Sequence, residues 1–287
     1  MLRFFEKMPP CLVGLEACGG SYYWVRQIAA LGHDVAVICK IMRFAPIKSA
    51  DQQAAAMVLK TRALLVRQQT QAISALRAHL SELGVIAATG PAKVEALTQI
   101  VRDETDARLP KAARFALTEI ADQIEMLRQQ IDKLERDIVT EAKRDEDMRR
   151  LNTIPGVGAI TAASMKALVP DADGFKSGRH FAAWLGLTPK PHSSGGMERL
   201  GRISKMGNPM LRSLLFLGAS SVLRRAKDNA KAPRWLIALL ARRPFKVVAV
   251  ALANKMARII WALSDQRWNI SKYWCGERLS RKRTRTD

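Results

Sequence analysis

Apolar residues recur at helical spacing through the middle of this 287-residue chain. Between Ser49 and Gly84 they return every three or four residues, and Gln52 stands three positions after Ser49, as in a capping box. In residues 112–150 the steps alternate between three and four over three heptads, which is the seam of a coiled coil. The pattern predicts two long helices, which either pair within one chain as an antiparallel hairpin or dimerise through the seam. Seven residues form this seam: Leu117, Ile120, Ile124, Leu127, Ile131, Leu134 and Ile138.

The segment before these helices, residues 11–39, has the pattern of one β-α-β unit whose helix turns Trp24, Val25 and Ile28 inward. Glu16 stands where the first strand ends, and ligands and metals tend to bind at the carboxyl ends of strands in open α/β sheets. On the pattern alone, a surface glutamate is the more common explanation. Two strands and a helix are too few for a stable open sheet, so we expect this segment to be poorly ordered or to pair with a partner's edge.

A glycine-rich turn at residues 154–162 has the form of the hairpin in a helix-hairpin-helix, a motif that binds the DNA backbone without sequence preference. Gly156 and Gly158 allow positive φ and close approach. Thr161 is expected to open a helix whose N–H groups can face a phosphate. The alternative is a plain corner between two helices that needs glycines to turn.

Charge changes this picture, because the chain carries a formal net charge of +21 that is very unevenly distributed. Residues 1–150 hold 22 Lys and Arg against 19 Asp and Glu, whereas residues 151–287 hold 25 against 7. The C-terminal half is therefore expected to face a polyanion, as in a nucleic-acid-binding protein. A cationic protein of membrane surfaces is less favoured, since no strongly amphipathic basic helix dominates.

The remaining composition indicates a soluble cytoplasmic protein without a membrane segment. The four cysteines form no C-x-x-C pair and no zinc spacing with the histidines, so they are expected to be reduced thiols. The N-terminus lacks the apolar core of a secretion signal. The longest apolar region, residues 235–253, is interrupted by Arg242, Arg243 and Lys246.

The densest candidate chemistry lies in residues 186–215, where the adjacent hydroxyls of Ser193 and Ser194 stand among glycines and cations. Glycines let backbone N–H groups approach an anion, cations screen it, and a nearby serine can attack it. A solvated basic connection is the alternative. Asn208 is expected to cap a following helix that begins at Pro209. The cations of the segment are Arg199, Arg202, Lys205 and Arg212.

This segment resembles the C-terminal domain of the IS110 transposases, including their IS1111 subgroup. The resemblance rests first on Ser-Ser-Gly-Gly at 193–196, Arg-Leu-Gly-Arg-Ile-Ser-Lys at 199–205, Gly-Asn at 207–208 and Leu-Arg at 211–212. Further stretches that are similar to that domain, in its order, are residues 154–162, 181–189 and 251–263. At the other end, residues 13–24 and 30–35 are similar to part of the family's RuvC-like N-terminal domain.

The resemblance implies a DNA recombinase in which a serine of the C-terminal domain attacks DNA. Ser194 matches the family's Ser-Gly and is the first choice for the nucleophile, with Ser193 second. Glu16 matches the glutamate of the family's Asp-Glu-Asp-Asp magnesium site, so Mg²⁺ is the expected cofactor. DNA, an element-encoded guide RNA and a homo-oligomer formed through the coiled coil are the implied partners. DNA or RNA contacts are expected from Gly156, Gly158, Thr161, Ser193, Arg199, Arg202, Lys205, Asn208 and Arg212.

The chain departs from the family pattern in the other three acidic positions. No aspartate precedes Asp34, and Cys39-Lys40 runs directly into residues 41–49, the piece that follows the family's Lys-Asn-Asp-x-x-Asp-Ala segment. One carboxylate cannot hold two Mg²⁺ ions. We therefore expect a truncated and internally deleted copy with impaired catalysis. The alternative is a non-catalytic, oligomerising nucleic-acid-binding remnant that inhibits intact relatives.

The expected fold is mostly α, with a small α/β remnant of a RuvC or RNase H-like domain at residues 1–48. A helical coiled-coil hairpin follows at 49–150. After a charged junction at 145–150, an α-helical C-terminal domain with the helix-hairpin-helix-like element is expected at 151–287. Its last residues, 278–285, form a basic tail.

Overall fold

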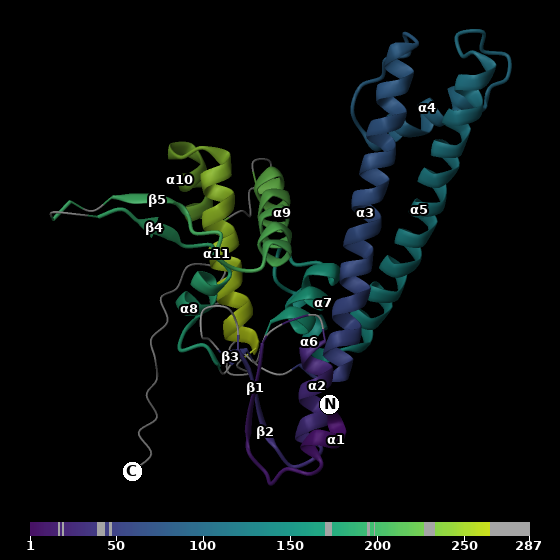
Figure 1. Ribbon diagram of the computed structural model, residues 1–287. Coiled ribbons are helices and arrows are strands. Elements are labelled where there is room, and N and C mark those ends of the chain that lie inside the picture. Colours follow the sequence, from purple (N-terminus) through teal and green to yellow (C-terminus); the bar gives the residue numbers. More distant parts are fainter. Residues whose placement is uncertain are drawn as a thin grey trace.

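The computed structural model describes residues 1–16, 18, 20–38, 44–45, 48–169, 174–193, 196–197, 199–226 and 233–264. Helices dominate these residues, which confirms the expectation of a mostly α protein. Figure 1 shows a cluster of C-terminal helices, a long helical arm on one side of it, and a small sheet below. The basic tail and Ser194 lie outside the described residues.

The N-terminal residues form the predicted β-α-β unit. Its two main strands run parallel, with Leu12 opposite Asp34 and Glu16 opposite Ile38, and a short antiparallel strand follows. Val25 and Ile28 of the helix are buried against the sheet, and Trp24 packs beside them. The helix covers only one face, so Leu12 and Glu16 on the other face are exposed. The elements are α1 (Leu2–Phe5), β1 (Leu12–Glu16), α2 (Ser21–Ala29), β2 (Asp34–Ile38) and β3 (Phe44–Ala45).

The arm consists of α3 (Ala50–Glu82), α4 (Pro91–Arg102) and α5 (Lys111–Arg144), of which α3 and α5 run antiparallel along each other (Figure 1). The capping box is confirmed, since the Gln52 N–H donates to Ser49 Oγ and the Ser49 N–H to Gln52 Oε1, both at 3.1 Å. Five of the seven seam residues are buried, while Ile120 and Leu134 are half-buried. The seam is therefore used within one chain.

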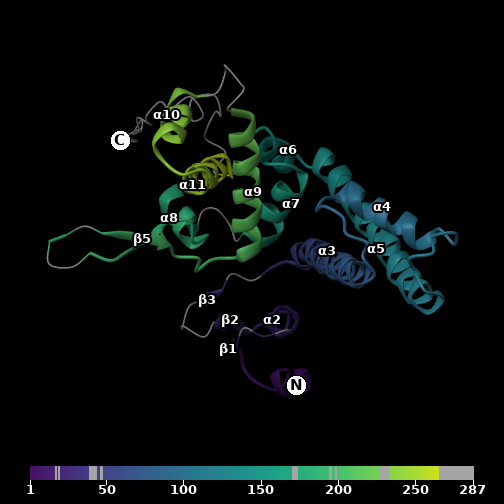
Figure 2. The ribbon, with the colours of Figure 1, turned by 90° about the horizontal axis from the view of Figure 1, so that it is seen from above.

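The C-terminal part surrounds one apolar helix, α11 (Phe245–Ser264), ten of whose residues are buried. This helix has the length and the mean hydropathy, 1.5, of a membrane span, but 56% of that stretch is buried inside the fold, as in the core helix of a soluble protein. It lies against α8 and α9, and α10 packs near one of its ends (Figures 1 and 2). The remaining elements are α6 (Glu146–Asn152), α7 (Ala159–Leu168), α8 (Gly178–Trp184), β4 (Pro189–Pro191), β5 (Leu200–Ile203), α9 (Pro209–Ala226) and α10 (Arg234–Arg242).

The base of the arm shares its core with the C-terminal helices. Ala56 and Leu59 of α3 and Ile138 and Ala142 of α5 belong to the same apolar cluster as the buried side of α11. The charged junction expected at residues 145–150 is helix α6 instead. Asp145 Oδ1 accepts the Met148 N–H at 2.9 Å, so this acidic residue is the N-cap of α6.

Two glycines bring the turn between α6 and α7 against the middle of α9. A carbon added to Gly156, whose φ is +86°, would lie 2.7 Å from the Gly218 carbonyl oxygen. A carbon added to Gly218 would overlap the Gly156 carbonyl oxygen in return. The Met256 methyl group of α11 lies close to both positions. Three elements therefore meet at one point where no side chain fits.

Gly218→Ala is expected to lower the free energy of unfolding by about 1–3 kcal/mol, because the added carbon pushes the turn away from α9. Urea unfolding followed by circular dichroism measures this change. Gly158→Ala is the control, since a carbon there meets no other atom and replaces only a glycine N-cap, at a cost below about 1 kcal/mol. Equal losses in the two variants would contradict the assigned close approach.

Candidate nucleic-acid interface

The serine segment forms a β-hairpin that projects from the C-terminal helices (Figures 1 and 2). In β4 and β5, Pro189 lies opposite Ile203 and Pro191 opposite Leu200. Beyond the strands, the His192 N–H donates to the Arg199 carbonyl oxygen at 2.7 Å. The sequence suggested only a loop leading into a helix. Its two proline-rich and cation-rich strands lack apolar alternation, and the Gly-Gly pair at 195–196 was the one local signal for a hairpin.

The base of this hairpin is fixed to the end of α8 by close backbone contacts. Gly186, with φ +74°, leaves no room for a side chain, because an added carbon would lie 2.7 Å from the Met206 nitrogen. A carbon on Gly207 would overlap the Trp184 carbonyl oxygen. The Lys205 N–H donates to the Gly186 oxygen at 3.1 Å, and Lys205 itself has a positive φ of 56°. The residues after β5 are thus held in one conformation.

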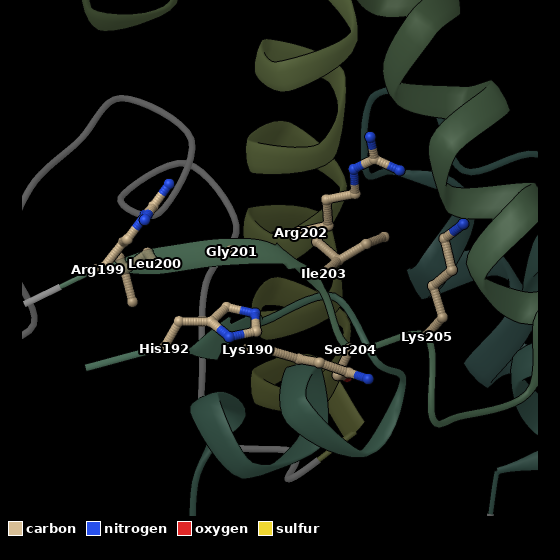
Figure 3. A pocket seen from close by; sticks show the side chains of 9 residues that line it. All are labelled: Lys190, His192, Arg199, Leu200, Gly201, Arg202, Ile203, Ser204 and Lys205. Atoms are coloured by element: carbon tan, nitrogen blue, oxygen red, sulfur yellow. The ribbon is translucent and has the colours of Figure 1, made fainter. Parts of the chain in front are cut away.

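One side of the hairpin is hollowed into an open basic cavity of about 660 Å³. Figure 3 shows that its side chains come from both strands and from the turn that follows. The His192 ring lies directly over Gly201, where an added carbon would come 2.6 Å from His192 Nε2. The absence of a side chain at Gly201 therefore leaves the space that the imidazole ring occupies. The charged residues that line the cavity are Lys190, Arg199, Arg202 and Lys205.

The charge around this cavity is unbalanced over the whole C-terminal part that the structure describes. The sequence between residues 151 and 264 contains 18 Lys and Arg against four Asp and Glu, and sixteen of these cations are among the described residues. Lys166 forms ion pairs with Asp145 and Asp147, which lie outside that range. Cations therefore far outnumber carboxylates in this part of the sequence, which favours an anionic ligand.

Of the residues predicted for the serine segment, Ser193, Arg199, Arg202 and Lys205 are brought together in the hairpin. The Arg199 N–H donates to Ser193 Oγ at 3.2 Å, which fixes that hydroxyl across the two strands. His192 lines the same cavity. It directly precedes the two serines and was the one histidine that the sequence offered as a candidate base.

Two further predicted contacts, Asn208 and Arg212, support the hairpin base. The Asn208 side chain accepts the Met210 N–H at 2.9 Å, so the predicted helix cap is confirmed. The Arg212 guanidinium donates to the carbonyl oxygens of Leu185 at 3.2 Å and of Gly207 at 3.0 Å. Arg212 therefore ties α9 to the end of α8 and to the turn below the hairpin.

The turn between α6 and α7 differs in part from the expected DNA-binding hairpin. Gly156 adopts the positive φ that a glycine allows, whereas Gly158 has φ −98° and does not use this freedom. Helix α7 begins at Ala159 and not at Thr161, which is buried in the core. Gly156 is turned toward α9. Gly158, exposed at the N-terminus of α7, is the member of this set that a phosphate could approach.

Glu16 lies exposed at the carboxyl end of β1, as predicted. Asp34 lies at the opposite end of the neighbouring strand, roughly 13 Å away at the usual rise per strand residue. Asp51 stands in the first turn of α3. Among the described residues no three acidic, histidine or cysteine side chains are grouped as metal ligands, so the donor set at Glu16 does not by itself fit Mg²⁺. Figures 1 and 2 both show β1 at a distance from the β4–β5 hairpin.

Comparison with known proteins identifies the family. Residues 148–233 match the Transposase_20 model, described as the transposase IS116/IS110/IS902 family. A putative transposase of Sinorhizobium fredii is 43% identical over 92% of this chain and 75% of its own length. A probable family 20 transposase of Pseudomonas aeruginosa is 42% identical over 91% of this chain and 86% of its own.

A third relative, the transposase for insertion sequence element IS1111A of Coxiella burnetii, is 36% identical over 93% of this chain and 80% of its own. The alignment with the Pseudomonas protein runs over 289 residues although it uses only 91% of this 287-residue chain, so that relative has residues without a counterpart here. Each of these three alignments covers more than nine-tenths of the chain. The chain belongs to the IS116/IS110/IS902 family of transposases.

Proposed function

We propose that this transposase binds the DNA backbone through the C-terminal part, with the β4–β5 hairpin at the centre of the contact. The observation that carries the proposal is the excess of cations between residues 151 and 264, where the sequence has 18 Lys and Arg against four Asp and Glu. Cationic side chains that neutralise DNA phosphates release the counterions bound to the DNA, which favours binding at low salt. Arginine suits this role because its guanidinium can contact a phosphate with two N–H groups.

The triple variant in which alanine replaces Arg199, Arg202 and Lys205 is expected to bind all DNA sequences more weakly, by about the same factor. The slope of log affinity against log salt concentration should fall by about 2–3, because each lost phosphate contact removes about 0.9. Fluorescence anisotropy with a short duplex between about 50 and 200 mM salt measures the slope.

The matched control replaces Lys60, Arg67 and Lys111, three exposed cations of the arm, and removes the same charge. Its slope should stay close to that of the unmodified chain. If the unmodified chain changed its affinity less than about threefold over this salt range, the phosphate-binding assignment would be wrong.

The strand-exchange chemistry that the family implies falls to Ser194. In that step its oxygen attacks a backbone phosphorus, a bridging oxygen leaves with a proton, and a phosphoserine link holds the strand for rejoining. Ser193 and the cavity cations would hold the phosphate, and an element-encoded guide RNA would select the target. In the family such a reaction would draw charge stabilisation from Mg²⁺ held by four carboxylates, of which only Glu16 has a counterpart here.

We propose that this chain alone does not complete that chemistry. Glu16 has no carboxylate neighbour on the adjacent strand, since β2 places Asp34 at its far end. The residues that the Pseudomonas relative has in addition are consistent with an internal deletion. A lone carboxylate binds a divalent ion weakly, and a serine hydroxyl without an activating metal or base is a poor nucleophile. Such a chain could still occupy DNA and inhibit intact relatives.

A recombination assay with supercoiled donor and target plasmids, Mg²⁺ and a cognate guide RNA tests this proposal. The chain by itself is expected to yield no recombinant joints above the level of Ser194→Ala, because the serine lacks its activating site. Ser194-dependent joints from this chain alone would contradict impaired catalysis. Joints that appear only with an intact relative would show that the C-terminal part remains competent.

We also propose that the arm mediates self-association. Its outward side exposes Leu64 of α3 (44% exposed) and Met126 of α5 (51%), although both helices already bury a seam against each other. Apolar side chains on a projecting pair of helices favour contact with a second copy.

Leu64→Asp with Met126→Asp is expected to lower the mass measured by light scattering while helicity stays unchanged, because both side chains lie outside the seam. Ile124→Asp with Ile131→Asp is the contrasting pair, since these residues are buried between the helices and their loss should unfold the arm. An unchanged mass in the first variant would show that the arm does not hold copies together.

A further inference from the structure

The β4–β5 hairpin has almost no apolar packing of its own. All three residues of β4 are exposed, and in β5 Gly201 and Ile203 are half-buried while Leu200 is 71% exposed. A two-stranded ribbon is marginally stable in water unless something else covers it. The close contacts at Gly186 and Gly207 hold its base, so the projecting part is presented to a partner in a fixed direction.

The prolines of β4 exclude a partner that would add a β-strand along the edge of β4. Pro189 and Pro191 have no backbone N–H, so another strand cannot extend the sheet along this edge by regular pairing. The ribbon carries Lys190, Arg199 and Arg202, and these cations suit a polyanion. A partner that accepts a narrow, basic, two-stranded element without pairing to the β4 backbone therefore suits the ribbon.

Duplex geometry selects between the nucleic acids. The major groove of B-form DNA, about 12 Å wide, admits a two-stranded β-ribbon, whereas the major groove of an RNA duplex is deep and too narrow. From this fit we infer that the β4–β5 hairpin lies in the major groove of DNA. The cavity cations then face the phosphates along the groove wall, and exposed Leu200 can contact thymine methyl groups. This inference rests on the proposed DNA binding and adds where on the duplex the hairpin lies.

The test compares two DNA duplexes that have the same sequence of about 30 base pairs, and it includes the RNA duplex of matching sequence. In one DNA, every cytosine carries a glucosylated hydroxymethyl group at C5, which fills the major groove and leaves phosphates and minor groove in place. The full chain is expected to bind the filled duplex at least about tenfold more weakly than the plain one, because the ribbon is shut out. The RNA duplex should also bind weakly.

Two matched variants show whether the hairpin causes this difference. Leu200→Glu places a carboxylate on the ribbon and should bring the affinity ratio between plain and filled DNA close to one. Leu217→Glu makes the same change on exposed α9 (61% exposed), outside the hairpin, and should keep the ratio.

Equal binding of plain and filled DNA by the unmodified chain would overturn the groove assignment and leave DNA binding intact. The same loss of ratio in both variants would overturn it too, as would tight, Leu200-dependent binding of the RNA duplex. No binding to any duplex at low salt would overturn the proposed function together with this inference.

Discussion

The contact between the Gly156 and Gly218 backbones determines how the C-terminal part is put together. It lets the α6–α7 turn reach α9 without an intervening side chain, and Met256 of α11 closes the same point from the third side. Helix α7 also packs on α3 and α5, so the direction of the arm depends on this contact. Helix α9 begins at the base of the hairpin, where Asn208 is its N-terminal cap. Arm and hairpin are thus attached to one rigid centre.

Elements that depend on neighbouring residues were predictable from the sequence. The capping box at Ser49, the end of α3 at Gly84 and the β-α-β unit each follow from a few adjacent residues, and the structure has them as expected. The antiparallel arm was one of two open alternatives, because heptad spacing does not say which chain fills the partner position. The structure resolves this by burying five seam residues against helices of the same chain.

Features that depend on distant residues were missed. The ribbon has no apolar alternation, and its geometry is imposed at the base, where Gly186 meets Met206 from twenty residues further along the chain. Helix α6 was taken for a junction because its charged sequence hides the apolar side that Met148 and Leu151 bury. Both Gly156 and Gly158 allow a positive φ and close approach, yet only Gly156 faces another backbone. Long-range contacts decide each of these cases.

Binding and chemistry make different demands on this structure. Phosphate binding sums many exposed charges, so it tolerates the loss of any one of them. A metal site needs several anionic ligands at fixed distances, and the β1–β2 register places Ile38, not an acidic residue, opposite Glu16 on β2. Arg212 shows a third demand, because its guanidinium is already engaged by the carbonyl oxygens of Leu185 and Gly207. In the proposed binding mode, Arg212 therefore holds the hairpin in place, and the exposed cations of the cavity attract the phosphates.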